Sequence, residues 1–261
     1  MIPAERRRTA LLLIHGFPHD RALWKPQVEG LKDLVLPIAP DLRGFGDSGE
    51  VPDTMTMSDY ASDLRTLLST MKVDEVVLCG LSMGGYIALA FLSKYPELVR
   101  GLVLCNTRAT ADDAAARKKR QALARKVLAD GTNAVTDDLI GPMLGERALR
   151  TRPDIVNGVK AMLDRQAPRA VAAAAKGMAM RQDRSGMLSG ITVPTLIITG
   201  ADDRAIPVAE SEAMHKAIPG SELTVIRNVG HLSNLEDPAT FNAHLRLFLI
   251  SVGLRSTRNV A

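Results

Sequence analysis

The 261-residue sequence has little cysteine and no long apolar run. Its two cysteines, Cys79 and Cys105, each end an apolar segment and are expected to be reduced residues of the core rather than a disulfide framework. No apolar stretch approaches the roughly 18 residues that span a bilayer. The basic start, residues 1–8, lacks the apolar stretch and the cleavage site of a signal peptide. These absences predict a cytoplasmic protein that does not enter a membrane.

Aromatic residues are also scarce, at 3%, and the excess of positive charge is confined to one segment. Residues 108–184 contain 16 Lys/Arg and 9 Asp/Glu, whereas the rest of the chain contains 17 and 20. The densest basic run, 117–120, lacks the interleaved aromatics and the recognisable module of a nucleic-acid site, so a solvated helix face is expected. The asymmetry marks a separate segment, whose positive charge could steer carboxylate-bearing substrates.

Outside this segment, apolar runs alternate with helical patterns. Strands are expected at 9–14, 34–39, 75–79, 101–105, 195–199 and 223–226. Helices are expected at 26–32, 58–71, 83–94, 208–217 and 238–252, and residues 255–261 are expected to fray. Ser58 is the predicted cap of the second helix. The alternation predicts an α/β protein with a mostly parallel sheet and right-handed crossovers.

The alternation stops in the basic segment. Residues 110–189 show helical patterns at 114–129, 134–140, 154–165 and 169–180, and no strand pattern. A chain with 46% hydrophobic residues can bury a sizeable core. We therefore predict a core domain formed by residues 1–108 and 190–261, interrupted by a helical cap at 109–189.

Ser82 is a candidate nucleophile. The motif Gly80-Leu81-Ser82-Met83-Gly84 joins the apolar run 76–78 to a helical pattern. Glycines two residues away on either side suit a sharp strand-to-helix turn that strains its middle residue while neighbouring segments pass close by. A glycine-rich turn with an incidental serine would have the same motif.

A nucleophilic serine needs a base, and the base needs a group that orients it. The five histidines are His15, His19, His215, His231 and His244. His215 and His244 lie inside helical patterns, whereas His231 follows the strand at 223–226 directly. Asp202 and Asp203 follow the strand at 195–199 in the same way. Because parallel strands deliver their following loops to one edge of the sheet, these groups and Ser82 are expected to gather there.

The order Ser, Asp, His is the order of the nucleophile-elbow fold, and the chain resembles the α/β-hydrolase superfamily over nearly its whole length. The matching motifs are His15-Gly16-Phe17-Pro18, Asp41-Leu42-Arg43-Gly44-Phe45-Gly46-Asp47-Ser48, Gly80-Leu81-Ser82-Met83-Gly84-Gly85, Gly200-Ala201-Asp202-Asp203 with Pro207, and Gly230-His231. The resemblance implies that Ser82 is the nucleophile and His231 the base. It selects Asp203, the third residue after Gly200, as the acid.

The resemblance also implies an oxyanion hole and a substrate pocket. Its donors would be the backbone N–H groups of Phe17 and Met83, and His15 would be structural. The helical segment matches the family's cap, which closes the pocket over the strand ends. The candidate pocket residues are Trp24, Tyr86, Met143, Leu144, Met162, Met178 and Met180, although methionines in helices often only pack the core.

One feature departs from the family. Its members commonly have an antiparallel hairpin before the first strand, but only residues 1–8 precede that strand here. We therefore expect a sheet of about six strands flanked by helices, with an enlarged open edge that a partner subunit could cover. The protein is expected to be a monomer or a homodimer.

The resemblance implies a serine hydrolase that cleaves a small ester or lactone through an acyl-enzyme. The pattern is most similar to enol-lactonases, arylesterases and cofactor-free haloperoxidases, and Pro18 in the oxyanion loop slightly favours the haloperoxidases. A perhydrolase, a C–C hydrolase, a thioesterase and a slow-turnover ligand receptor on this fold remain alternatives. Haloalkane dehalogenation is disfavoured because that branch has Asp in place of Ser82. No phosphate loop, dinucleotide fingerprint or metal-ligand cluster is recognisable, so no cofactor or metal is expected.

Overall fold

The computed structural model describes residues 8–254 and contains a six-stranded sheet. The strands are β1 (Thr9–Ile14), β2 (Leu36–Ile38), β3 (Glu75–Leu81), β4 (Val99–Cys105), β5 (Thr195–Gly200) and β6 (Glu222–Ile226). Their spatial order is β2-β1-β3-β4-β5-β6, and every neighbouring pair is parallel. The predicted sheet of about six mainly parallel strands is confirmed.

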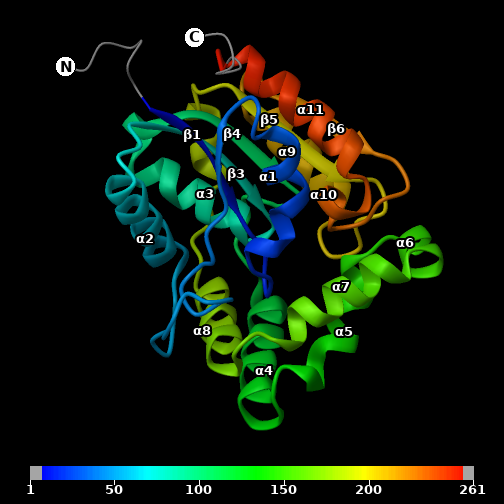
Figure 1. Cartoon of the computed structure of the whole chain (residues 1–261). Helices are drawn as coiled ribbons and strands as arrows, with labels where there is room; N and C mark the ends of the chain where they lie inside the picture. Colours follow the sequence, from blue (N-terminus) through cyan, green and yellow to red (C-terminus); the bar gives the residue numbers. More distant parts are fainter. Residues whose placement is uncertain (1–7, 255–261) are drawn as a thin grey trace.

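Helices cover both faces of this sheet (Figure 1). Helices α1 (Lys25–Leu31) and α11 (Pro238–Ser251) share one apolar cluster with Leu11 and Leu13 of β1. Helices α2 (Met57–Thr70), α3 (Met83–Lys94) and α9 (Val208–Ala217) share the other with Leu12 and Ile14. Residues 10–14 of β1 thus enter the two clusters in turn and are all buried, which is why the strand reads as an unbroken apolar run.

Helix α2 begins at a different residue from the one predicted. Its cap is Thr56, whose Oγ1 accepts a hydrogen bond from the Asp59 N–H at 3.1 Å. The Asp59 carboxylate in turn accepts from the Thr56 N–H at 2.9 Å. The prediction of Ser58 as the cap is wrong, because the carboxylate three residues after Thr56 completes this reciprocal pair and leaves Ser58 inside the helix.

Five α-helices and the short 3-10 helix Ser185–Gly190 lie between β4 and β5. The α-helices are α4 (Ala114–Asp130), α5 (Asn133–Met143), α6 (Glu146–Thr151), α7 (Pro153–Asp164) and α8 (Pro168–Ala179). We call α4–α8 the insertion. Figure 1 shows it across the carboxyl ends of the strands. Four of its helices match predicted segments. Helix α6 was not predicted, because six residues are too few to show a helical period.

The two cysteines are free and buried, as predicted, with their Sγ atoms 3.8 Å apart. Burial raises the pKa of the Cys105 thiol. No helix within residues 8–254 is long and apolar enough to cross a membrane.

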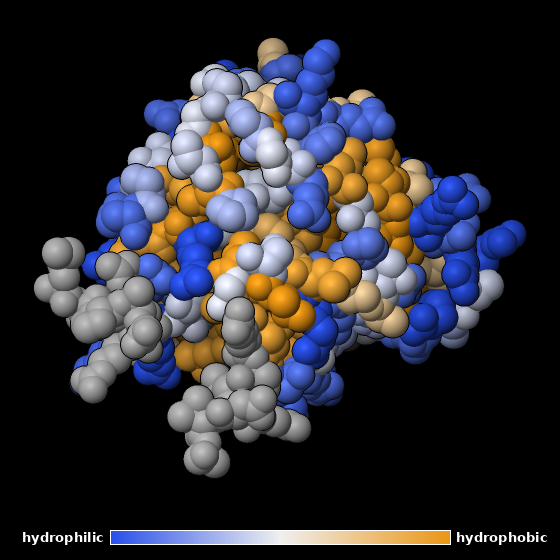
Figure 2. Space-filling model, turned by 90° about the horizontal axis from the view of Figure 1, so that it is seen from above, coloured by the Kyte–Doolittle hydropathy of each residue, from blue (hydrophilic) through white to orange (hydrophobic). Residues whose placement is uncertain are grey.

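The surface opposite the insertion mixes apolar and hydrophilic patches, as Figure 2 shows from above. Leu247 and Ile250 of α11 are among the exposed large apolar side chains. One edge of the sheet is β2, which has only three residues and pairs with β1 alone. So short an edge is a weak template for pairing with another chain. A partner subunit over it stays a prediction.

Candidate active site

Ser82 lies at the turn between β3 and α3 in a strained backbone conformation. Its φ is 55° and its ψ is −115°, a combination that residues with a side chain rarely adopt. The Ser82 N–H donates to the Cys105 carbonyl at 2.9 Å, and Thr107 Oγ1 donates to the Ser82 carbonyl at 2.8 Å. A Cβ at Gly84 would lie 2.1 Å from the Ile14 carbonyl oxygen, so α3 starts too close to β1 for any larger residue. These contacts hold the strained turn in place.

The loop after β1 lies against this turn. A Cβ at Gly16 would be 3.4 Å from the Ser82 Cβ and 3.2 Å from the Leu81 carbonyl oxygen, so the loop that carries Phe17 lies beside Ser82. Met83 is the first residue of α3, where a main-chain N–H has no acceptor within the helix. Both predicted donors are thus close to Ser82 in the fold, and their role in an oxyanion hole stays a prediction.

His15 links two loops beneath this site. The Leu42 N–H donates to its Nε2 at 3.0 Å, so the ring proton is on Nδ1, which donates to the Gly16 carbonyl at 2.9 Å. Burial lowers the pKa of His15 and favours this neutral form. With both ring nitrogens engaged, His15 has the contacts expected of a structural residue.

His231 and Asp203 form a buried pair at the carboxyl edge of the sheet. Nδ1 of His231 lies 2.8 Å from Oδ2 of Asp203, and the two side chains are 5% and 0% exposed. The other oxygen, Oδ1, accepts from the main-chain N–H groups of Ala205 and Ile206, each at 2.8 Å. Because an ionised carboxylate only accepts, Nδ1 carries the proton and Nε2 is left free to act as a base. The neighbouring Asp202 is exposed.

Asn106 completes the hydrogen bonds of Asp203 and was not predicted from the sequence. Its Nδ2 donates to Oδ2 of Asp203 at 2.9 Å, and its Oδ1 accepts from the Ser233 hydroxyl at 2.6 Å. Asn106 directly follows β4, so the argument that selected the loops after β5 and β6 would also have found it. Ser233 offers no such signal, because it becomes relevant only through Asn106.

The insertion contacts the loop that carries His231. The Met143 carbonyl at the end of α5 accepts from the N–H groups of His231 and Leu232, at 3.1 and 3.2 Å. The last carbonyls of a helix have no partner within it, so this loop satisfies one of them. Glu236 adds a second link, because its two carboxylate oxygens accept from the N–H groups of Gly145 and Gly230, each at 2.9 Å. Burial raises the pKa of Glu236.

The predicted pocket residues lie at different places. Trp24 is fully buried in the core, with its ring centroid 6.1 Å from that of Phe241. Met143 and Leu144 are buried where the insertion meets the His231 loop, and Met178 is buried in α8.

The other three predicted pocket residues line hollows. Met162 lines an open, mainly apolar hollow of about 460 Å³ between α7 and the start of α1. Tyr86 lines a separate cleft with several arginines. Met180, 67% exposed, lines that same cleft.

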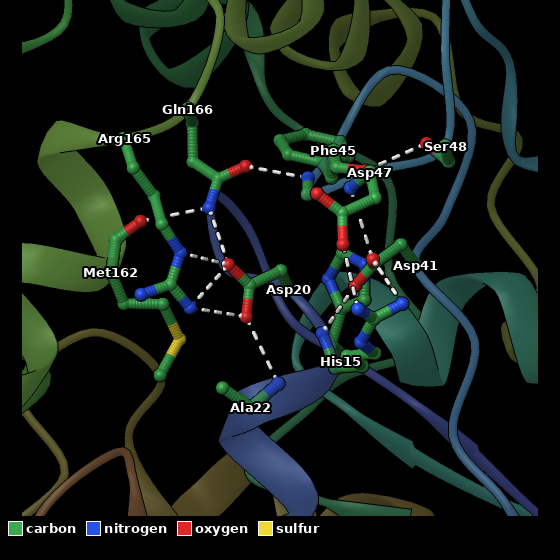
Figure 3. A network of polar contacts seen from close by, with 12 residues as sticks. His15, Asp20, Ala22, Asp41, Phe45, Asp47, Ser48, Met162, Arg165 and Gln166 are labelled. Carbon is green, nitrogen blue, oxygen red and sulfur yellow. Dashed lines mark hydrogen bonds and ion pairs between the residues drawn. The ribbon is translucent and has the colours of Figure 1, made fainter.

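A network of polar contacts joins the insertion to the loop after β1 (Figure 3). Asp20, only three residues beyond Phe17, accepts from Nε and Nη2 of Arg165 at 2.6 and 2.7 Å and from Nε2 of Gln166 at 2.8 Å. Gln166 Oε1 accepts in turn from the Gly46 N–H at 3.0 Å. Burial alone would raise the pKa of Asp20, but the hydrogen bonds from Ala22, Arg165 and Gln166 outweigh it and lower that pKa. The sequence offered no signal for this network.

Replacing Asp20 by Asn is expected to lower the free energy of unfolding by about 1–2 kcal/mol, because an amide at this buried position cannot accept all the hydrogen bonds from Arg165 and Gln166, whereas Arg165 itself is half exposed and can turn to water. The control is Asp154→Asn, which breaks the exposed pair with Arg152 (63% exposed carboxylate) and should cost less than about 0.5 kcal/mol. Urea unfolding at neutral pH measures both. Equal effects of the two substitutions would show that the contacts of Asp20 with the insertion do not stabilise the fold more than an exposed ion pair does.

His19 is a second buried histidine in the loop after β1, and it differs from His15. Its side chain is 0% exposed, and neither ring nitrogen makes a hydrogen bond of ordinary geometry within residues 8–254. Burial, reinforced by the nearby His15 and His231, lowers its pKa to about 3. Folding therefore requires the neutral form of His19.

His19→Phe should make folding less sensitive to acid. Between pH 6.5 and about 3 the unfolded chain binds a proton at His19 that the folded chain does not, so wild-type stability falls as the pH drops through this window. Between pH 7 and 5 this residue alone should cost the wild type about 2 kcal/mol, a loss that the variant avoids. Urea unfolding of both proteins at the two pH values measures it. The same loss in both proteins would contradict the buried neutral histidine.

Among residues 8–254, no group of three or more His, Cys, Asp or Glu side chains is arranged to hold a metal ion. The groups gathered at the carboxyl edge are instead a strained serine, a histidine oriented by a carboxylate, and main-chain donors.

Comparison with known proteins places this arrangement in a family. The family model of the alpha/beta hydrolase fold matches residues 9–238. A solved structure of a thermophilic esterase from Thermogutta terrifontis, with malate bound, is 39% identical, with a TM-score of 0.92 over 94% of this chain and 91% of that one.

Two curated relatives are more distant in sequence. The 3-oxoadipate enol-lactonase 2 of Acinetobacter baylyi is 26% identical over 90% of this chain and 86% of its own length. A putative carbamate hydrolase of Agrobacterium fabrum is 28% identical over 92% of both chains. With the family model covering most of the sequence, the six-stranded parallel sheet and the turn at Ser82 have a common explanation: the chain belongs to the α/β-hydrolase family.

Proposed function

We propose that this chain is a serine hydrolase that cleaves a small ester or lactone, with Ser82, His231 and Asp203 as its catalytic triad. The observation that carries the proposal is the buried hydrogen bond between His231 and Asp203, at the sheet edge where β3 ends in the strained turn at Ser82. That bond leaves Nε2 of His231 available to accept a proton. The order of the three residues along the chain is the order typical of this fold.

In the proposed mechanism, His231 Nε2 takes the Ser82 Oγ proton as Oγ attacks the carbonyl carbon. The N–H groups of Phe17 and Met83 donate to the oxyanion that forms. His231 then gives its proton to the leaving oxygen, and the acyl group stays on Ser82. A water molecule, deprotonated by His231, attacks this ester and releases the acid, and the proton returns to Ser82. Asp203 keeps the His231 ring in the required tautomer throughout.

The choice of an ester or a lactone is supported by the relatives, one an esterase at 39% identity and one an enol-lactonase. The test is turnover of p-nitrophenyl esters and of small lactones, together with labelling by a fluorophosphonate. We expect one label per chain, on Ser82, and steady hydrolysis of a short-chain ester or of a lactone. A burst of one equivalent with no further turnover would instead indicate a receptor built on the hydrolase fold.

A further inference from the structure

A cleft of about 210 Å³ lies where the chain leaves the sheet after β4 and comes back to it from α8. Tyr86 of α3, Arg108, Arg181 and Arg184 line it, together with residues 56–58 at the start of α2. No acidic side chain is among its lining residues in the described part of the chain. Three guanidinium groups therefore surround one hollow.

The hydrogen bonding of these arginines is incomplete. The Nε atoms of Arg108 and Arg181 are buried and have no acceptor within residues 8–254. The Arg181 side chain is only 4% exposed, so bulk water does not replace the missing acceptor. A buried donor without a partner costs about 1–3 kcal/mol, and native structures seldom leave one unpaired. The arginines that form the wall of the cleft thus have more hydrogen-bond donors than the protein supplies acceptors.

The charge of the cleft is also only partly balanced. Asp112 forms ion pairs with Arg108, Arg120 and Arg181, at 2.8, 2.5 and 2.6 Å. Glu210 adds a 3.9 Å contact to Arg108, and Asp183 adds an attraction to Arg181.

Arg184 is the arginine that these carboxylates leave unpaired. No carboxylate of the described residues pairs with it, and the side-chain contact of its Nη1 is with the Met187 sulfur at 3.8 Å. Burial without a counter-charge lowers the pKa of Arg184. The unbalanced positive charge is therefore at this residue.

Two further groups favour an anion here. The first N–H groups of α2, at Met57 and Ser58, have no acceptor within the helix and carry its positive dipole end. The Arg181 guanidinium lies 4.2 Å above the Tyr86 ring, which fixes its plane. Tyr86 is one turn along α3 from Ser82, because its N–H donates to the Ser82 carbonyl at 3.3 Å. The cleft therefore shares helix α3 with the candidate active site, although Ser82, Asp203 and His231 are not among its lining residues.

We propose that this cleft binds the carboxylate of a small organic anion, with Arg184 as its principal ligand. The planar fork of a guanidinium matches a carboxylate in two parallel hydrogen bonds, and Arg184 lines the cleft without a carboxylate partner of its own. Cavities of roughly 150 Å³ hold a benzene molecule, so this one has room for a chain of about four carbons. The inference concerns binding and does not depend on the proposed function.

Calorimetric titration with succinate, and with uncharged succinamide as the control ligand, tests the proposal. Ser82→Ala serves as the background, so that turnover plays no part. We expect succinate to bind and succinamide not to bind. Arg184→Gln should weaken succinate binding at least tenfold, and Arg184→Lys should weaken it less. Arg125→Gln, which removes one charge from an exposed position of the insertion, should leave it unchanged.

Equal succinate affinities in the background protein and in Arg184→Gln would overturn the proposal, provided that both variants melt as folded proteins. Equal binding of succinamide would overturn it too. Two sources of the carboxylate can then be separated with active enzyme. If it belongs to the substrate, mono-p-nitrophenyl succinate should be hydrolysed with a higher kcat/KM than p-nitrophenyl butyrate, and Arg184→Gln should remove that preference. If it is a free anion, the preference should be absent while succinate still binds.

Discussion

Replacing Ser82 by Ala is expected to lower kcat for a short-chain aryl ester by about 10⁵-fold or more, because no other group in the proposed mechanism can form the acyl-enzyme. Alanine keeps the Cβ of serine, so the strain at a φ of 55° is the same in both proteins. The fold should therefore persist, and the variant should melt within a few degrees of the wild type. Initial rates with p-nitrophenyl acetate measure the loss.

The matched control for this experiment is Ser189→Ala, at an exposed position after α8. It should hydrolyse the ester at the wild-type rate. Activity of Ser82→Ala within tenfold of the wild type, in a preparation free of other esterases, would rule out Ser82 as the nucleophile. Loss of fluorophosphonate labelling in Ser82→Ala but not in Ser189→Ala would identify the labelled residue directly.

Asp203→Asn should lower kcat by about 10⁴-fold while leaving the substrate KM nearly unchanged. The Ala205 and Ile206 N–H groups require an oxygen at one position of the side chain, so the new amide NH₂ takes the place of Oδ2, where it faces Nδ1 of His231 and leaves Nδ2 of Asn106 without its acceptor. It would donate to Nδ1 and force the ring proton onto Nε2, which could then no longer accept the serine proton. Measurement of kcat and KM with the same aryl ester tests this tautomer argument.

Asp202 provides an unusually close control, because it is the adjacent residue, has the same side chain and is exposed. Asp202→Asn should retain the wild-type kcat. A larger loss of kcat in Asp202→Asn than in Asp203→Asn would show that Asp202, and not Asp203, orients the histidine. Similar small losses in both would show that orientation of His231 by a carboxylate is not needed for turnover.

The parts of the fold that could be predicted are those with a local cause. Strands β1, β3 and β4 are buried on both faces, so they read as unbroken apolar runs. The meeting of His231 with the loop of Asp202 and Asp203 was also accessible, because the rule that loops after parallel strands meet at one edge is independent of side-chain packing; the choice of Asp203 over Asp202 came from the family resemblance. Helix α6 was missed because six residues are too few to show a helical period. The cap at Thr56 was missed because Ser58, two residues later, is also a suitable cap residue.

The contacts between the insertion and the core could not be predicted, because they depend on how helices separated in the sequence pack together. Nothing local indicates that the Met143 carbonyl reaches the His231 loop or that Arg165 reaches Asp20. The charge pattern shows the same limit. The sequence drew attention to the run 117–120, which is mostly exposed. The arginines that gather around a cleft, Arg108 and Arg184 among them, lie at the two ends of the basic segment.

The bond from the His231 loop to the Met143 carbonyl limits how this protein can be recombined with its relatives. A chimera that exchanges the whole of α4–α8 would keep this main-chain support only if the new segment ends a helix at the same place and has glycine at position 145, where a Cβ would lie 2.9 Å from the Gly230 nitrogen; otherwise it should lose activity toward every substrate. One that exchanges α4, α7 and α8 but keeps the native α5–α6 junction retains that support. We therefore expect that helices before and after the α5–α6 junction can be exchanged to change the substrate range, whereas exchange of the junction itself puts activity at risk.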